Sequence, residues 1–116
     1  MINIGSIDGI GVPMMDNYSY SASKAAVHQL TRHMAKELVK DHITVNAIAP
    51  GLFPSQMTKW AFEDDSMSDA IAGNIPIGRH GRPEDIAGTA IYLSSRAGAF
   101  VTGAVVVVDG GSATLR

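Results

Sequence analysis

The chain has 116 residues, of which 46% are hydrophobic and 17% charged, and this composition suits one domain with a buried core. Nine Lys and Arg residues against eleven Asp and Glu residues give a net charge of −2, which argues against binding to nucleic acid. The absence of Cys excludes a disulfide scaffold and any Cys-ligated metal site. No apolar run approaches the roughly 18 residues of a membrane span and no signal peptide is visible, so we expect a cytoplasmic protein.

The first half of the chain predicts a strand, a long helix and a second strand. Residues 2–4 have the composition of a buried strand, and residues 8–17 form a loop rich in Gly, Pro, Asp and Asn. Helical periodicity then predicts an amphipathic helix over residues 20–40, and β-branched residues predict a strand over 42–48 that ends before Pro50-Gly51. The expected apolar stripe of the helix consists of Val27, Leu30, Met34 and Leu38.

The second half predicts an irregular insert followed by a helix and a strand. The insert covers residues 52–81, with one or two short helices around residues 60–62 and 67–72. Pro83 and the acidic residues after it suit the first turn of a helix that stops near Gly98. Residues 105–108 are four consecutive valines, which predicts a fully buried strand. Strands that alternate with helices indicate a parallel sheet, and this chain provides about half of a doubly wound nucleotide-binding fold.

Three side chains suggest chemistry at the carboxyl end of the predicted sheet. Tyr20 and Lys24 stand four residues apart at the start of the long helix, so both side chains lie on one face. A neighbouring ammonium stabilises tyrosinate and lowers the pKa of a phenol, which helps the phenol exchange a proton with a substrate oxygen. Ser6 follows the first strand, where open parallel sheets bind ligands, and its hydroxyl can orient a carbonyl oxygen. The set suits carbonyl reduction or alcohol oxidation with a cofactor that supplies the hydride.

The Tyr–Lys spacing alone does not identify an enzyme. With three tyrosines in the chain, the spacing arises readily by chance, and a surface pair on a helix would show it too. Its position between a strand–Ser–Gly loop and the segment 45–51 is the distinguishing feature. Tyr18 is the rival phenol, but Ala22 stands four residues beyond it, so no cation assists it.

Five segments stand in one particular order along the chain: residues 3–6 (NIGS), 20–26 (YSASKAA), 45–51 (VNAIAPG), 81–87 (GRPEDIA) and 102–111 (TG through VDGG). In these segments, and over essentially all 116 residues, the chain resembles the C-terminal half of the short-chain dehydrogenase/reductase family. The resemblance implies one partial α/β domain, residues 1–116. This domain would be the C-terminal half of a Rossmann-like doubly wound parallel sheet, with about three strands, a long catalytic helix and an irregular lid insert.

The resemblance implies a role for each catalytic candidate. Ser6 polarises the substrate oxygen, Tyr20 is the general acid/base, and Lys24 assists Tyr20. The implied reaction is hydride transfer between a nicotinamide cofactor and a ketone or secondary alcohol. The long loop between Ser6 and Tyr20 and the segment 53–55 resemble 3-oxoacyl reductases of the rhamnolipid-pathway type, which favours a 3-oxoacyl thioester as substrate. Four apolar residues of the insert either touch this substrate or only pack two short helices: Met57, Trp60, Phe62 and Ile71.

The implied cofactor is NADP or NAD, with NADP favoured. Lys24 would bond the nicotinamide ribose, Phe53 would offer its backbone to the carboxamide, and Ser55 stands where many members have Thr. The positions that match the cofactor site are Tyr20, Lys24, Pro50, Gly51, Phe53 and Ser55.

The family's Gly-rich phosphate-binding turn, its cofactor selector and its catalytic Asn belong to segments that would precede those matched here. Gly5, Gly9 and Gly11 have the glycine spacing of that turn, but Val12-Pro13 follows them in place of a helix. We therefore interpret the three glycines as part of an active-site loop. Without the phosphate site we expect no turnover by this chain in isolation, and self-association through an unpaired sheet edge and an uncovered apolar face.

Two further interpretations concern histidines and partners. We interpret His28, His33, His42 and His80 as solvated or helix-surface side chains, and we expect no metal site. The alternative to an enzyme is an inactive α/β remnant that acts as an association module. In the family the long helix packs into a dimer interface, which implies a homo-oligomer and a small-molecule ketone or alcohol as the other partner, with neither nucleic acid nor a membrane. The candidate subunit contacts are Ala25, His28, Gln29, Arg32 and His33.

Overall fold

The structure is a computed structural model that describes residues 1–115. Within these residues the strands and α-helices are, in chain order, β1 (Ile2–Ile4), α1 (Tyr18–Leu38), β2 (Asn46–Pro50), α2 (Asp65–Asn74), α3 (Pro83–Ser94) and β3 (Val105–Val108). Short 3-10 helices connect them: η1 (Ile7–Gly9), η2 (Val39–Asp41), η3 (Lys59–Phe62) and η4 (Arg96–Gly98).

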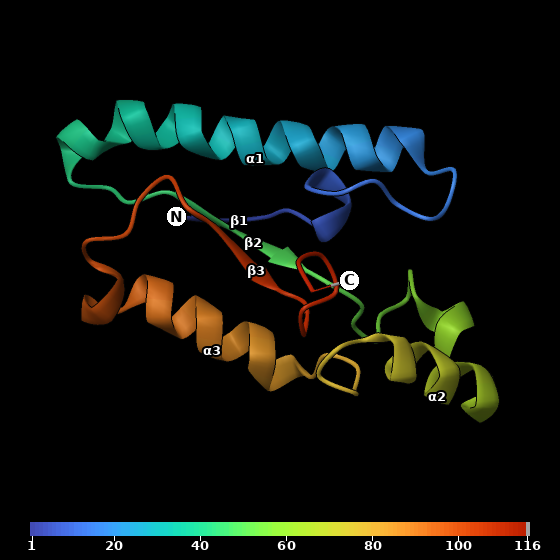
Figure 1. The fold of residues 1–116 in the computed structure, drawn as a ribbon. Helices are drawn as coiled ribbons and strands as arrows, with labels where there is room; N and C mark the ends of the chain where they lie inside the picture. The colour runs from blue at the N-terminus through green and yellow to red at the C-terminus, as the bar shows by residue number, and fades with distance from the viewer. Residues whose placement is uncertain (116) are drawn as a thin grey trace.

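The strands form one parallel sheet in the order β1-β2-β3, which confirms the predicted α/β arrangement. The register places Ile48 of β2 beside Ile4 of β1 and Val106 of β3. Helix α1 covers one face of the sheet and α3 covers the other, so the molecule has three layers (Figure 1). The insert with η3 and α2 lies beyond the carboxyl ends of the strands (Figure 1).

The central strand β2 forms most of the buried core. Its polar residue Asn46 is buried, and the Asn46 side chain donates to the Val101 carbonyl at 2.8 Å and accepts from the Ala104 amide at 3.0 Å. These two bonds hold β2 to the segment that leads into β3. Ala35 from α1 and Leu93 from α3 are buried from the two helix layers. The completely buried apolar residues of β2 and its approach are Val45, Ala47, Ile48 and Ala49.

The prediction that residues 2–4 and 105–108 are buried strands is correct for the strands and wrong for the burial. Ile4 is 51% exposed and Val107 is 37% exposed. Within the described sheet β1 and β3 each pair with β2 alone, so solvent reaches their outer edges and part of their faces. An apolar run indicates a strand that can be buried, but the neighbours that bury it are not encoded in the run itself.

The face of α1 that meets the sheet differs from the predicted apolar stripe. Leu30 is 52% exposed, whereas the buried residues of the helix are His28, Thr31 and Ala35. The Thr31 hydroxyl accepts from the Asn3 side chain of β1 at 3.0 Å, which joins helix and sheet by a polar contact. His28 is only 4% exposed, so the interpretation of it as a helix-surface side chain is wrong, and it is not available for a subunit contact.

Most predicted boundaries hold to within a few residues. The strand predicted over 42–48 is β2, which begins later because His42 adopts a left-handed backbone conformation (φ 59°) that turns the chain after α1. Both short helices predicted in the insert are present as η3 and α2. Helix α3 begins at Pro83 as predicted, where the Asp85 carboxylate accepts from the Arg82 amide, and it ends at Ser94, short of Gly98.

Candidate active site

The main pocket lies where the carboxyl ends of the three parallel strands meet. The Ser6 loop (residues 5–17) follows β1, the insert (residues 52–81) follows Gly51 after β2, and residues 109–115 follow β3. Between these segments lies a pocket of about 600 Å³. Its polar side chains come from Ser6, Asp8, Asn17, Tyr20, Thr58, Trp60 and Ser112, and Gly51 lines it with its backbone.

Ser6 is fixed by its position at the start of η1. Its hydroxyl oxygen accepts from the Asp8 amide at 3.1 Å, and its own amide donates to Nε2 of His28 at 3.3 Å. The Ser21 hydroxyl of α1 donates to the Asp8 carbonyl at 2.7 Å. The loop is therefore joined to α1 at two points, and the buried Ser6 side chain lines the main pocket.

Tyr20 lines the same pocket as Ser6, and Lys24 lies beside it. The Lys24 ammonium is 5.6 Å from the centre of the Tyr20 ring and donates to the Ile4 carbonyl at 3.0 Å. The rival phenol, Tyr18, is exposed, and its hydroxyl lies near Asp16 instead. The structure thus brings the three predicted catalytic side chains to one end of the sheet.

Pro50 and Gly51 bring the chain out of the sheet at the floor of the pocket. Pro50 is the last residue of β2 and pairs with Val108, and the Gly51 amide donates to the Val108 carbonyl at 2.9 Å. A Cβ at Gly51 would lie 2.7 Å from Cβ of Asp109, so only glycine allows this close approach. Gly51 lines the main pocket directly, whereas Pro50 sets where Gly51 lies.

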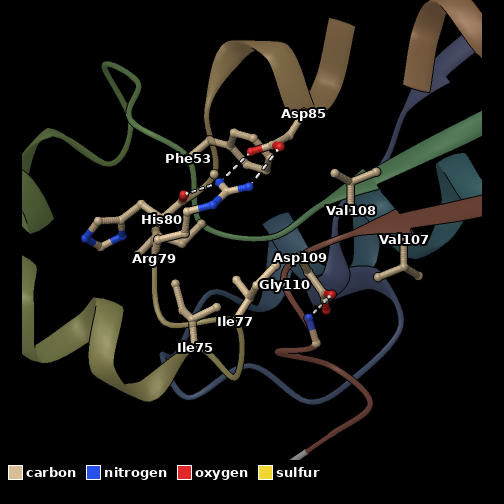
Figure 2. A pocket seen from close by; sticks show the side chains of 13 residues that line it. Phe53, Ile75, Ile77, Arg79, His80, Asp85, Val107, Val108, Asp109 and Gly110 are labelled. Carbon is tan, nitrogen blue, oxygen red and sulfur yellow. Dashed lines mark hydrogen bonds and ion pairs between the residues drawn. The ribbon is translucent and has the colours of Figure 1, made fainter. Parts of the chain in front are cut away.

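Phe53 and Ser55 do not project into the main pocket. The Phe53 ring lines a second pocket of about 330 Å³ (Figure 2). The ring packs against Gly81. The exposed Ser55 hydroxyl lies 3.1 Å from the hydroxyl of Thr58, and the Thr58 hydroxyl also donates to the Phe53 carbonyl. Thr58 lines the main pocket and sequence reasoning missed it, although the Ser55-x-x-Thr58 spacing is typical of a side-chain-capped turn.

The second pocket has an ion pair on its wall. Arg79 donates to both carboxylate oxygens of Asp85, at 2.8 and 3.1 Å, and also to the His80 carbonyl (Figure 2). The Arg79 guanidinium and the Arg82 amide together lower the pKa of Asp85 to about 2. In Figure 2 the His80 ring points away from this ion pair. The charges here are paired with each other, and they join the end of the insert to the start of α3.

The apolar residues of the insert divide between substrate-facing and packing positions. Met57 and Trp60 line the main pocket, and the Trp60 side chain is 49% exposed there. Phe62 packs edge-on against the His80 ring, with a centre-to-centre distance of 4.6 Å. Ile71 is half-buried and belongs to neither pocket lining. Of the four candidates, two are placed to touch a ligand.

The glycines of the Ser6 loop are not followed by an α-helix. Residues 7–9 form the single turn η1, and α1 does not begin until Tyr18. Their interpretation as an active-site loop therefore agrees with the structure. Within residues 1–115, no cluster of three or more His, Asp or Glu side chains is arranged to hold a metal ion, and no described helix is both long and apolar enough to span a bilayer.

The family of the chain follows from sequence comparison. The family model described as "Enoyl-(Acyl carrier protein) reductase" matches residues 1–113. The chain is 52% identical over 111 residues to the rhamnolipids biosynthesis 3-oxoacyl-[acyl-carrier-protein] reductase of Pseudomonas aeruginosa, a match that covers 96% of this chain and 43% of that enzyme. The chain belongs to the short-chain dehydrogenase/reductase family. This short-chain dehydrogenase/reductase is also 42% identical over 113 residues to galactitol 2-dehydrogenase (L-tagatose-forming) of Cereibacter sphaeroides, covering 96% of this chain and 44% of the other.

Solved structures of short-chain dehydrogenase/reductases share this fold. The Pseudomonas aeruginosa RhlG/NADP active-site complex matches with a TM-score of 0.90 at 52% identity, over 97% of this chain and 45% of that one. 4-Hydroxyisoleucine dehydrogenase complexed with NADH matches with a TM-score of 0.91 at 34% identity, and the match covers 99% of this chain and 47% of that one. The described sheet is therefore a fragment of the Rossmann-like fold of this family, and the chain spans less than half the length of the relatives it matches.

Proposed function

We propose that this protein is a nicotinamide-dependent oxidoreductase that interconverts a ketone and a secondary alcohol. The observation that carries the proposal is the shared pocket. The Ser6 hydroxyl and the Tyr20 phenol line one cavity at the carboxyl edge of the sheet, with the Lys24 ammonium beside the phenol. Relatives that are 52% and 42% identical are named as a reductase and a dehydrogenase, which supports the reaction class.

Each of the three side chains has a separate task in this reaction. Ser6, held in place through its backbone, donates a hydrogen bond to the substrate oxygen and orients it toward Tyr20. The Tyr20 hydroxyl gives its proton to that oxygen in reduction and takes it back in oxidation. The positive charge of Lys24 favours the phenolate that remains on Tyr20 after the proton has left. A bound nicotinamide supplies or accepts the hydride.

The donor set at the edge of the main pocket fits a nicotinamide nucleoside. Lys24 uses one of its three N–H donors on the Ile4 carbonyl, which leaves two for the hydroxyls of a ribose. Tyr20 stands beside it, and Gly51 and Leu52 line the pocket where the chain leaves β2, so that the backbone of the next residue, Phe53, would meet the carboxamide. Ser55 would contribute from the outer turn. NADP is favoured because the 52% identical neighbour is an NADP complex.

We propose a 3-oxoacyl thioester, or a ketone of similar apolar character, as the substrate. The rim of the main pocket is rich in exposed apolar side chains, which suit an acyl chain better than a polyhydroxylated sugar. The 52% identical relative is named as a 3-oxoacyl reductase. The rim residues are Val12, Met14, Met15, Met57 and Trp60.

The test is an NADPH-oxidation assay on the complete protein that contains these 116 residues. We expect kcat/KM to be higher for a 3-oxoacyl thioester than for 5-keto-D-gluconate, and higher with NADPH than with NADH. Faster reduction of the sugar acid would replace the substrate proposal while leaving the reaction class in place. No turnover of any ketone or secondary alcohol would overturn the reaction class.

We also propose that residues 1–116 form the active-site half of a longer, cytoplasmic, homo-oligomeric enzyme. The relatives are more than twice as long as the matched segment, and several large apolar side chains are exposed on α3, on β3 and in the turn between η4 and β3. Sedimentation of the complete protein would measure the oligomer directly. A monomer at micromolar concentration would contradict this proposal. The exposed apolar residues are Ile91, Tyr92, Phe100 and Val107.

A further inference from the structure

The ring of His28 occupies a slot in the backbone of the Ser6 loop. His28 lies two turns after Tyr20 on α1, and only 4% of its surface is exposed. A Cβ at Gly5 would lie 2.0 Å from Nε2 of the ring, and a Cβ at Gly9 would lie 3.0 Å from its Cε1. Gly5 is therefore a glycine because the imidazole fills the space that a side chain would need, whereas at Gly9, the last residue of η1, the α1 backbone at Lys24 and Ala25 lies closer still, at 2.6 Å.

The hydrogen bond between the Ser6 amide and His28 requires a neutral ring. The Ser6 amide donates to Nε2 at 3.3 Å, so Nε2 must carry a lone pair, and the ring proton lies on Nδ1. The ring also forms a hydrogen bond with the backbone of Gly9. Protonation of Nε2 would set an N–H against the Ser6 N–H and would abolish that bond.

The surroundings of the imidazole oppose its protonation. Burial lowers the pKa of His28 below its ordinary 6.5, and the charges of Arg32 and Lys24 on the same helix lower it further, against the Gly9 hydrogen bond, which raises it. From the Ser6 loop the nearby carboxylate is Asp8, which accepts from the side chain of Asn17. Neither β1 nor β2 contains a titratable residue. The ring is therefore neutral near pH 7 and takes up a proton only in acid.

We propose that His28 is a positioning residue for Ser6: the neutral imidazole holds the Ser6 backbone so that the hydroxyl faces the pocket that Tyr20 lines, and protonation releases the loop. The inference rests on the proposed function, because it assigns His28 a role in orienting the Ser6 hydroxyl for the same reaction. Its consequence is a loss of kcat in acid that reflects His28, while the KM for the cofactor stays constant.

The kinetic test compares three variants of the complete protein between about pH 5 and pH 8. His28→Leu fills the slot but cannot accept a hydrogen bond, His28→Gln keeps an acceptor near Nε2 but does not titrate, and His33→Gln on the exposed face of α1 is the control. We expect His28→Leu to lower kcat roughly ten- to hundredfold at every pH with an unchanged cofactor KM. We expect His28→Gln to keep most of the activity and to lose the acid decline that wild type and His33→Gln share.

A second measurement needs neither a variant nor turnover. In the NMR spectrum of the wild-type protein, the Ser6 amide proton is expected to shift with the same apparent pKa as the His28 ring. A Ser6 amide that does not respond while His28 titrates would overturn the proposal, and so would His28→Leu with the kcat and pH profile of His33→Gln. If Ser6→Ala and Tyr20→Phe remain fully active, the proposed function fails, while the coupled titration still reports on His28.

Discussion

The two sides of the main pocket are held together in different ways. On the side of β1 and α1, hydrogen bonds fix the Ser6 backbone to His28 and join Asn3 to Thr31, with His28 and Thr31 buried. On the side of the insert, the turn at Ser55 and Thr58 is exposed, and η3 and α2 contact mainly each other. A polar group that is buried must keep its partner, so the first side is restricted to one arrangement, and the second is not.

This difference separates the chemistry from the choice of substrate. The side chains proposed to move the proton lie on the restricted side, where a small displacement would cost much of the rate. The exposed apolar side chains Met57 and Trp60 lie on the other side, where they can adapt to a ligand. Variants on the two sides should therefore differ in kind: kcat should fall on the first side, and the KM for the ketone should rise on the second.

The largest effect is expected for Tyr20→Phe. Removal of the hydroxyl takes away the proton donor but leaves the ring, so kcat should fall by about a hundredfold to ten-thousandfold with an unchanged circular dichroism spectrum. Tyr18→Phe is the matched control and should keep full activity, because Tyr18 is exposed outside the pocket. An active Tyr20→Phe enzyme would move the acid/base role to another group.

Lys24→Met should have the next largest effect, on both kcat and cofactor KM. It removes the charge beside Tyr20 and the donor that reaches the Ile4 carbonyl. A charged hydrogen bond contributes about 1.5–3 kcal/mol, which corresponds to about ten- to hundredfold in cofactor KM. Steady-state kinetics with Lys36→Met as the control, on the exposed side of α1, would check this. An unchanged cofactor KM would show that Lys24 does not bind the nucleotide.

Trp60→Ala tests the side of the pocket that the insert forms. We expect the KM for an apolar ketone to rise about tenfold, because part of the indole surface is lost from the pocket, while kcat changes little. Val39→Ala in η2, which is exposed to a similar degree (51% against 49%) and lies outside the pocket, is the control and should leave both constants unchanged. A fall in kcat as large as that of Tyr20→Phe would break the distinction between the two sides.

The smallest effect is expected for Asp85→Asn at the end of the insert. The pKa of Asp85 is lowered from 3.8 to about 2, so its ion pair with Arg79 stabilises the fold above about pH 4, and this contribution disappears as the pH falls toward 2. At neutral pH the Tm should fall by about 3 °C or less, because the pair is partly exposed. The Tm difference between variant and wild type should vanish near pH 2. A difference that persists there would mean that charge pairing is not its cause.

The features that the sequence predicted best are those that depend on residues close together in the chain. Pro83 and the acids after it predict the start of α3, and the positions of Tyr20 and Lys24 one helical turn apart follow from their spacing. The order of strands and helices predicts the parallel sheet. The position of Ser6 directly after the first strand predicts that it belongs to the same site, and the structure places it in the pocket that Tyr20 lines.

The features that the sequence did not predict depend on segments far apart in the chain. His28 looks like a surface residue on a helix, and its burial becomes clear only when Gly5 and Gly9 pack against it. The exposure of Val107 depends on whether a further segment covers β3, which a run of valines does not show. Thr58 lines the pocket, and its hydrogen bond with Ser55 holds it in the turn there.

The most direct test of the account is a double-mutant cycle on Ser6 and Tyr20 in the complete protein, measured as NADPH-dependent ketone reduction. If the two hydroxyls act on one substrate oxygen, Ser6→Ala and Tyr20→Phe each cause a large loss of kcat. The double variant should then be little worse than the more damaged single variant. Losses that multiply independently, or a double variant as active as wild type, would contradict a shared site.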